Sequence, residues 1–423
     1  MLHLMPNVKE EGNISAKKGK MTMLYRTMKK NGDSLSILGF GAMRLAQKDQ
    51  KIDEARATKQ IRDAIDQGVN YVDTAWAYHG GESELFLGRA LAGGYREKVR
   101  LATKLPSWLI KAREDMDRYL DAQLKKLNTN RIDYYLLHGL NGVLWDSLNS
   151  LNALDFLEKA KGDGRIVNAG FSFHGVSDVF RNIVDAYDWE FCQIQYNYLD
   201  TETQAGKKGL EYAASRGLGV IVMEPLRGGN LGQPSPPPAV QDVWDKAQQR
   251  RSPAEWALRW VWNHPEVTLV LSGMNVESQI TENIAIAGNA YPNSLMESEL
   301  QLIEKVAQTY RKIMRVGCTG CGYCQPCPAD VLIPNCFDIY NNMHMFNTTA
   351  EAPFMYVMRT GGSLTGKPGY ASKCNQCGEC LDKCPQQIDI PTYLEKVAAE
   401  LEGPHLAQVE QMVRQMLFKS IDS

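Results

Sequence analysis

Four ionisable side chains stand at or just after the ends of three apolar runs, and their types suit proton-transfer chemistry. Asp73 ends one run and Tyr78 follows it five residues later, while Lys104 and His138 end the next two runs. A tyrosine ordinarily has a pKa of about 10, and a nearby ammonium group stabilises its phenolate. In this arrangement Tyr78 is the candidate general acid or base and Asp73 holds Lys104 in place. His138 would donate a hydrogen bond to a substrate oxygen.

Eight of the ten cysteines form two short runs near the end of the chain. CxxC spacing in a chain without an export signal predicts metal binding rather than disulfides. Three thiolates spaced every third residue can hold one four-iron cluster, while a fourth thiolate followed by proline reaches a second cluster. Two zinc sites of four thiolates each are the alternative that these pairs allow. The runs are Cys318, Cys321, Cys324 and Cys327, then Cys374, Cys377, Cys380 and Cys384.

The elements that must position the four ionisable residues repeat in a strand-then-helix rhythm. Eight such units predict an α/β fold, a closed parallel (β/α)8 TIM barrel with its helices outside. Polar groups at the carboxyl ends of barrel strands are typical of an active site. The predicted strands lie near 37–42, 69–73, 99–104, 132–137, 166–171, 191–195, 218–223 and 267–271.

Bulk properties exclude several classes of protein. The net charge is −2 and both signs are interspersed, so no basic face for nucleic acid is expected. No apolar run reaches the roughly 18 residues of a membrane span, and the start lacks the apolar core of a signal peptide. We expect a cytoplasmic protein without a membrane span.

Motifs around these residues resemble the aldo-keto reductase superfamily over roughly residues 23–290. The similar segments are DTAWAY, which contains Asp73 and Tyr78, the strand end at Lys104, DYYLLH, which ends at His138, and SELFLGRAL. The resemblance implies that these four residues form a tetrad that passes a hydride from a nicotinamide to a carbonyl, with Tyr78 as proton donor. It also implies that a hairpin around Asn31-Gly32 closes the barrel floor.

The same resemblance implies a set of residues that bind the nicotinamide nucleotide. Phe173 and Met223 depart from the asparagine and the stacked aromatic of the family, whereas Ser172 and Gln193 match it. Gln279 replaces the arginine that grips the 2′-phosphate of NADPH, and losing that charge-assisted contact weakens the expected preference for NADPH. NAD(P)H is therefore expected, with NADH, or a flavin in the same phosphate site, left open. The implied contacts are Met43, Ser172, Gln193, Pro225, Leu226, Gly228, Ser272, Gly273, Gln279 and Asn283.

The barrel and both cysteine runs together resemble the ferredoxin-type aldo/keto reductases, and the second run matches the bacterial two-cluster ferredoxin pattern. That resemblance implies two 4Fe-4S clusters. One would be held by Cys318, Cys321, Cys324 and Cys384, the other by Cys327, Cys374, Cys377 and Cys380. The implied organisation is a disordered tail (1–22), the barrel (23–295), a connecting helix (296–316) and a small, mainly helical ferredoxin-like domain with C-terminal helices (317–423).

The function that follows is an oxidoreductase that interconverts a small carbonyl compound and an alcohol. Its clusters would link it to a one-electron carrier such as ferredoxin. Two alternatives stay open. The chain could be an electron-transfer or docking subunit, flavin-containing or not, whose barrel has lost carbonyl reduction. The clusters could also be structural only.

Overall fold

A computed structural model describes residues 23–318, 320, 322–363, 366–384 and 386–418. The expected tail over residues 1–22 and the expected ligand Cys321 lie outside the described residues.

Eight parallel strands close into a barrel, in the order β10-β11-β12-β3-β6-β7-β8-β9. This confirms the predicted fold class. The strands form where apolar, β-branched and aromatic residues run together, because a strand covered by helices on one side and by the barrel interior on the other is buried on both faces. They are β3 (Leu38–Gly41), β6 (Tyr71–Asp73), β7 (Arg100–Leu105), β8 (Ile132–Leu140), β9 (Ile166–Phe173), β10 (Phe191–Gln195), β11 (Gly219–Met223) and β12 (Val267–Ser272).

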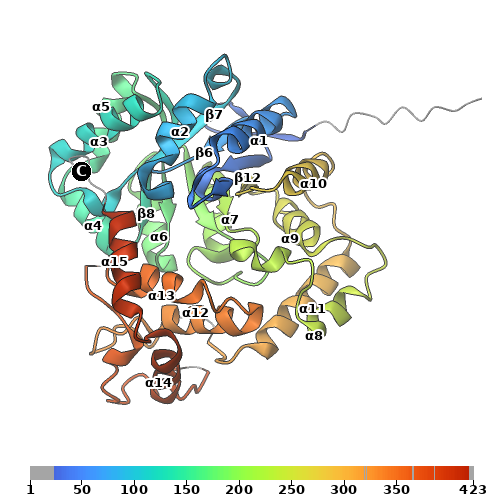
Figure 1. The fold of residues 1–423 in the computed structure, drawn as a ribbon, viewed down its shortest axis with the longest axis vertical. Coiled ribbons are helices and arrows are strands. Elements are labelled where there is room, and N and C mark those ends of the chain that lie inside the picture. Colours follow the sequence, from blue (N-terminus) through green and yellow to red (C-terminus); the bar gives the residue numbers. More distant parts are fainter. Residues whose placement is uncertain (1–22, 319, 321, 364–365, 385, 419–423) are drawn as a thin grey trace, which may run out of the picture.

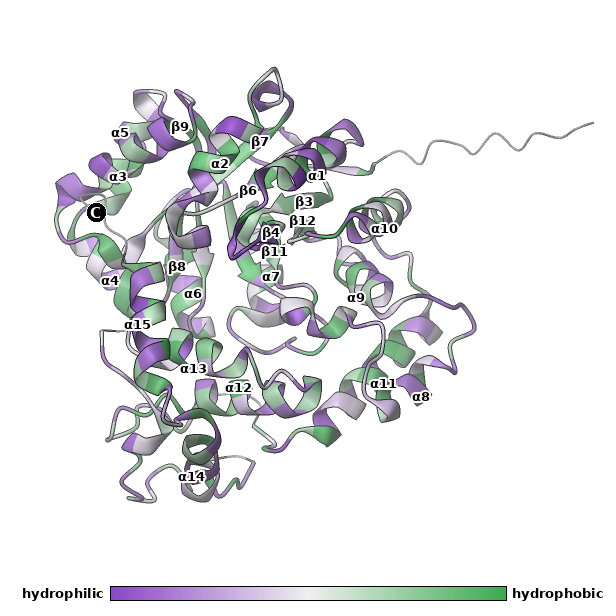
Figure 2. Ribbon diagram, viewed as in Figure 1, coloured by the Kyte–Doolittle hydropathy of each residue, from purple (hydrophilic) through white to green (hydrophobic). Residues whose placement is uncertain are grey.

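A ring of helices surrounds the barrel (Figure 1). Hydrophobic and hydrophilic residues alternate along these outer helices, as expected when one face lies against the strands (Figure 2). Ser252 caps the amino terminus of α9 (Pro253–Trp262), since its hydroxyl accepts a hydrogen bond from the Glu255 amide at 3.0 Å. The helices are α1 (Glu54–Asp66), α2 (Ser83–Ala90), α3 (Arg113–Lys126), α4 (Gly142–Ser150), α5 (Ala153–Gly162), α6 (Ser177–Asp185), α7 (Gly206–Ser215), α8 (Pro238–Trp244), α9 (Pro253–Trp262) and α10 (Glu277–Ala287).

A short hairpin closes the amino-terminal end of the barrel. It consists of β1 (Tyr25–Thr27) and β2 (Ser34–Ser36), which pair antiparallel. Met28 and Leu35 of the hairpin pack into the same apolar cluster as Tyr71 and Tyr134 of the barrel strands. A second two-stranded ribbon, β4 (Gln47–Lys48) with β5 (Lys51–Ile52), precedes α1.

The C-terminal region is helical and packs against the barrel. Its helices α12, α13 and α15 lie on the side toward the barrel, while α14 lies farther out (Figure 1). The long helix α11 packs on α8 and leads from the barrel to this region. The helices are α11 (Glu297–Ile313), α12 (Ile333–Phe346), α13 (Ala352–Thr360), α14 (Ile390–Leu401) and α15 (Leu406–Leu417).

One apolar core joins the C-terminal helices to a loop of the barrel. Ala77, which directly precedes Tyr78, is buried in the same cluster as Val316, Phe337 and Leu417. Helix α15 packs against the short 3-10 helix η2 (Tyr78–Gly81). The C-terminal region therefore lies at the carboxyl-terminal end of the barrel, where the predicted active site is located.

Candidate active site and cysteine cavities

A buried lysine connects two of the four residues singled out from the sequence. Lys104 of β7 has no exposed surface. Its Nζ donates to Asp73 Oδ1 at 2.6 Å and to the Thr74 carbonyl at 2.7 Å, and it lies 3.4 Å from the Tyr78 hydroxyl. The parallel register places Asp73 beside Ala102, two residues before Lys104, so the strand pairing itself brings carboxylate and ammonium together. Such a pair inside the protein keeps the ammonium charged.

Tyr78 lies on η2, directly after the buried Ala77. Burial raises the pKa of Tyr78 above its ordinary value, and Lys104 opposes that effect by stabilising the phenolate. The net direction is upward, whereas the sequence pattern alone suggested a lowered pKa. The difference arises because burial of the phenol outweighs the nearby ammonium. Tyr78 is therefore a protonated phenol at neutral pH, which suits a proton donor.

His138 faces Tyr78 across the end of β8. The two ring centroids lie 6.1 Å apart, and the His138 ring lies 5.1 Å from that of Trp108. Burial, Lys104 and His174 hold the pKa of His138 well below its ordinary value, so the imidazole is neutral at neutral pH. Its buried Nδ1 has no hydrogen-bond partner among the described residues. A neutral imidazole with a ring nitrogen to spare can hydrogen-bond a substrate oxygen.

The loop that carries Tyr78 is fixed on several sides. His79, in the left-handed region at φ 53°, accepts a hydrogen bond from the Leu45 amide at 3.1 Å. Thr74 and Ser83 share a buried hydrogen bond of 2.8 Å between their hydroxyls. Ala77 is held in the apolar core of the C-terminal helices. These contacts hold the phenol in place beside Lys104.

Two of the expected nicotinamide contacts lie on neighbouring strands. Ser172 on β9 pairs in register with Gln193 on β10, and Gln193 Nε2 lies 3.5 Å from the sulfur of Met223 on β11. The buried Oε1 of Gln193 has no partner among the described residues. An unsatisfied buried acceptor costs free energy, and the amide group of a bound nicotinamide would supply the missing donor. These residues therefore fit the cofactor.

The residues expected to hold the phosphates gather around Arg44. Its guanidinium donates to the Gly228 carbonyl, and a Cβ at Gly273 would lie 3.2 Å from the Arg44 Cβ. Met43, beside it, is 56% exposed and available for contact. Leu226 is half-buried, and its side chain packs against two apolar cores. Pro225, its neighbour, is buried.

The adenosine end of the expected site lies at the start of α10. Asn283 donates to Ser272 Oγ at 3.1 Å, and Gln279 accepts from the Asn275 amide at 3.3 Å. Glu277, in the first turn of α10, forms two hydrogen bonds with Arg56, of 2.8 and 2.6 Å. That carboxylate stands two residues before Gln279, the residue expected to face the 2′-phosphate of NADPH.

The two cysteine runs come together around two cavities. The first cavity is lined by Cys324, Cys327, Cys374, Cys377 and Cys380. The second is lined by Cys318, Cys324 and Cys384. Residues from both runs thus meet at each cavity.

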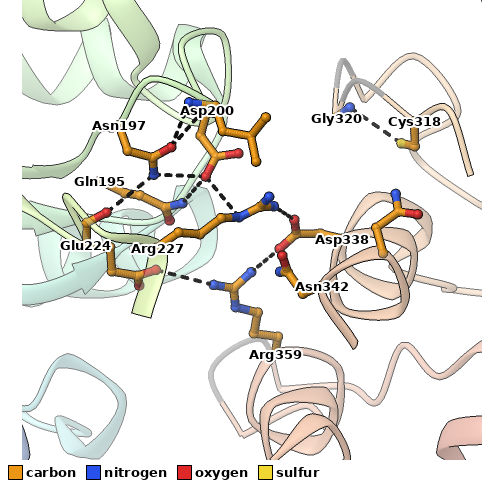
Figure 3. Close-up of polar contacts among 12 residues, drawn as sticks. Gln195, Asn197, Asp200, Glu224, Arg227, Cys318, Gly320, Asp338, Asn342 and Arg359 are labelled. Carbon is orange, nitrogen blue, oxygen red and sulfur yellow. Dashed lines mark hydrogen bonds and ion pairs between the residues drawn. The ribbon is translucent and has the colours of Figure 1, made fainter. Parts of the chain in front are cut away.

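Two polar details support a metal-binding role for these thiols. Burial raises the pKa of Cys380, and the nearby thiols of Cys374, Cys327 and Cys377 raise it further. Metal coordination would remove this mutual repulsion because it stabilises thiolates. The amide of Gly320 donates to Cys318 Sγ at 3.4 Å (Figure 3), a kind of contact that tunes iron–sulfur clusters.

The remaining two cysteines are buried in apolar surroundings. Cys192 on β10 and Cys336 on α12 have no exposed surface. Burial raises the pKa of Cys336 to about 12. Neither belongs to the two cysteine runs, and both pack as small apolar side chains.

Comparison with known proteins agrees with this architecture. The model of the aldo/keto reductase family matches residues 37–307. The chain belongs to the aldo/keto reductase family. The model of a 4Fe-4S dicluster domain matches residues 317–388, a span that contains all eight clustered cysteines.

Several members of the aldo/keto reductase family resemble the barrel. L-galactose dehydrogenase of Arabidopsis thaliana is 24% identical over 306 residues, covering 68% of this chain and 95% of that protein. Methylglyoxal reductase YeaE of Escherichia coli is 26% identical over 254 residues, covering 58% and 82%. The holo form of an aldo-keto reductase from Bacillus halodurans superposes with a TM-score of 0.57 at 25% identity, covering 68% of this chain and 97% of that one.

The family implies a small carbonyl substrate and NAD(P)H, and the dicluster domain with its cysteines implies two 4Fe-4S clusters. No helix among the described residues is long and apolar enough to span a membrane.

The sequence did not reveal how closely the C-terminal region approaches the barrel site. Trp108, on the 3-10 helix η4 (Ser107–Leu109), contacts both His138 and Leu417. Arg227, on the 3-10 helix η5 (Arg227–Gly232), pairs with Asp338 of α12. The contacts of Trp108 with Leu417 and of Arg227 with Asp338 join residues more than 100 positions apart. No local pattern in the sequence predicts such a contact.

Proposed function

We propose that this protein reduces a small carbonyl compound to an alcohol, or oxidises the alcohol, at the site formed by Asp73, Tyr78, Lys104 and His138. The observation that carries the proposal is the buried Lys104, which bridges the Asp73 carboxylate and the Tyr78 hydroxyl. Charged groups are buried at such cost that an unexplained lysine–aspartate pair beside a phenol favours catalysis over packing.

The residues of the site divide the reaction between them. Ser172 and Gln193 would hold a nicotinamide, which would supply a hydride, two electrons and a proton together, for the carbonyl carbon. Tyr78 gives its hydroxyl proton to the carbonyl oxygen, which completes the alcohol, and Lys104 stabilises the phenolate that remains. Asp73 keeps Lys104 charged and in position. His138 donates a hydrogen bond to the same oxygen, and solvent returns a proton to Tyr78. Alcohol oxidation is the same sequence in reverse.

For the nucleotide we propose NADH in preference to NADPH. Ser172 and Gln193 would hold the carboxamide, and Gly228 and Gly273 would lie near the phosphates. Gln279 offers no positive charge to a 2′-phosphate, whereas a carboxylate such as Glu277 suits a free 2′-hydroxyl. Arg56 neutralises part of that carboxylate. Met43, Ser272 and Asn283 complete the contacts that we propose, and Pro225 and Leu226 would contribute only through their backbone.

For the clusters we propose the ligand sets that the cavities favour. Cys327, Cys374, Cys377 and Cys380 all line the first cavity, and Cys318, Cys324 and Cys384 line the second. Cys321 would complete the second set. The clusters would supply one-electron transfer to a ferredoxin-like carrier. We propose residues 23–295 as the barrel unit, 296–316 as the connector and 317–423 as the cluster unit.

The number of electrons transferred limits how the nicotinamide can exchange electrons with the clusters. A hydride carries two electrons, whereas each cluster exchanges one. We therefore propose that electrons pass between nicotinamide and clusters through a flavin, which either binds in the barrel or is supplied by a partner protein other than the one-electron carrier. One relative is named for L-galactose and another for methylglyoxal. Small sugars and compounds with two adjacent carbonyl groups are therefore the first substrates to test.

The test is anaerobic purification followed by analysis of iron, acid-labile sulfide, zinc and flavin, with carbonyl reduction measured on the same sample. About eight irons per chain, as two four-iron clusters require, with turnover of sugars or methylglyoxal by NADH would support the proposal. Zinc in place of iron would overturn the electron-transfer role. Turnover only with a reduced carrier protein, and none with either nicotinamide nucleotide, would overturn the role of the barrel as a carbonyl reductase.

A further inference from the structure

The loop that follows β11 adopts an unusual backbone conformation. Glu224 and Arg227 lie in the left-handed region at φ 53° and 48°, followed by Gly228 at 72° and Gly229 at 103°. Glycine adopts these angles freely, but side chains with a Cβ do so only when their surroundings hold them. The loop therefore depends on contacts that fix Glu224 and Arg227.

Those contacts come from both parts of the protein (Figure 3). Arg227 is 6% exposed, and its guanidinium pairs with Asp338 of α12 and with Asp200 of the barrel, the latter at 3.3 Å. Arg359 of α13 lies 2.6 Å from the other Asp338 oxygen and 3.9 Å from the Glu224 carboxylate. Asp338 thus pairs with both arginines. It contacts Arg227 directly and is linked to Glu224 through Arg359.

The barrel half of this network is fixed independently. Gln195 and Asn197 donate to Asp200 Oδ2 at 3.2 and 3.0 Å, and Asn197 also donates to the Glu224 carbonyl at 3.3 Å. The half that depends on the C-terminal region consists of Asp338 and Arg359. Arg227 is buried, whereas the Asp338 side chain is 30% exposed. Without Asp338, Arg227 would keep Asp200 as its only ionic partner and Arg359 would keep only the longer contact with Glu224. A buried charge loses more when a partner is removed than an exposed charge does.

The helix that carries Asp338 also borders the cysteines. Ile333, the first residue of α12, lines both cysteine cavities, and Phe337 lines the second. Asp338 is the next residue. One short helix therefore reaches from the expected cluster sites to Arg227.

The loop itself borders the expected nucleotide cleft. The Gly228 carbonyl accepts a hydrogen bond from Arg44, whose side chain extends along Gly273. We propose that Asp338 is a positioning residue for nucleotide binding: from the cluster-bearing region, it holds Arg227 and so keeps residues 224–232 in the shape that binds the cofactor. This inference rests on the proposed function, because it takes the residues around Arg44 as the nucleotide site. Asp338 itself touches neither cofactor nor substrate.

The test compares Asp338→Asn, Asp338→Glu and the control Glu351→Gln, an exposed carboxylate at the start of α13. Binding of NADH is measured by fluorescence titration, and hydrogen exchange is followed over residues 224–232. Asp338→Asn is expected to raise the dissociation constant of NADH about tenfold, because Arg227 then keeps only Asp200 as an ionic partner. The kcat at saturating NADH should change less than about twofold, since an interaction equal in ground and transition state alters affinity alone. Asp338→Glu should recover part of the affinity, and Glu351→Gln should match the unaltered protein.

Hydrogen exchange gives a readout that does not require turnover. Faster exchange in residues 224–232 of Asp338→Asn, with α10 unchanged and full iron content, would support the inference. Unchanged NADH affinity together with unchanged exchange would overturn it. If Asp338→Asn loses iron, Arg359→Gln interrupts the same network and is judged by the same two outcomes. Failure of the unaltered protein to bind NADH would reject the proposed function and this role in nucleotide binding. The exchange data would then show only whether Asp338 orders the loop.

Discussion

Trp108 donates its indole N–H to the backbone carbonyl of Leu417, the last residue of α15, at 3.1 Å. The same indole lies beside His138, with ring centroids 5.1 Å apart. The final helix of the chain is thus tied to a side chain that borders the candidate active site. The candidate site of the barrel is here in contact, through Trp108, with a helix that lies outside the barrel.

Trp108→Phe removes that hydrogen bond while keeping an aromatic ring beside His138. One such bond contributes about 1 kcal/mol, so we expect exchange of the α15 amides to accelerate roughly fivefold. Hydrogen exchange measured by mass spectrometry checks this. Trp244→Phe is the matched control, because the buried indole nitrogen of Trp244 has no partner among the described residues. Equal acceleration of α15 in both variants would contradict the assignment.

Tyr78→Phe removes the proposed proton donor but leaves the ring. General acid catalysis contributes about 10²- to 10⁴-fold, so kcat for carbonyl reduction should fall at least about 100-fold. Affinity for NADH should stay unchanged, because the hydroxyl acts on the substrate oxygen. Tyr291→Phe, at an exposed position, serves as control. A kcat within a few-fold of the unaltered enzyme would exclude Tyr78 as the donor.

The pH profile follows from the directions of two pKa shifts. Burial raises the pKa of Tyr78 above 10, and burial lowers the pKa of His138 well below 6.5. Reduction requires protonated Tyr78, so its rate should be flat through neutral pH and fall only above pH 10. Oxidation requires the phenolate of Tyr78, so the oxidation rate should rise with pH from neutral pH to above pH 10. Steady-state rates in both directions check this, and an inflection near pH 6.5 that disappears in His138→Gln would show that His138 titrates in the working range.

The strands were predictable because each is an apolar run between helical segments. Each observed strand begins and ends within two residues of its predicted bounds, except that β8 continues to Leu140. The meeting of Asp73 and Lys104 was likewise predictable, since neighbouring parallel strands end at the same edge. The pKa direction of Tyr78 was not, because burial is a property of the assembled site. Arg227 and Asp338 could not be paired from sequence, since isolated charged residues usually lie at the surface.

Gln279→Arg restores a positive charge at the start of α10. Arginine binds phosphate through a charge-assisted, bidentate contact, so affinity for NADPH should rise about tenfold relative to NADH. Dissociation constants for both nucleotides check the change. Gln301→Arg, the same substitution on the exposed face of α11, is the control. An unchanged ratio of the two affinities would show that Gln279 does not face the ribose phosphate.

Cys327→Ser distinguishes the proposed ligand sets from the alternative in which each cysteine run binds its own cluster. Cys327 belongs to the first run, yet it lines the same cavity as Cys374, Cys377 and Cys380. If it completes their set, the variant should damage the cluster held by the second run and leave the other intact, so iron should fall from about eight to about four per chain. Mössbauer and electron paramagnetic resonance spectra of Cys327→Ser and Cys374→Ser should then show the same surviving cluster. Cys192→Ala, in a barrel strand, should keep its full iron content. Different surviving clusters in the two serine variants would mean that each run binds its own cluster.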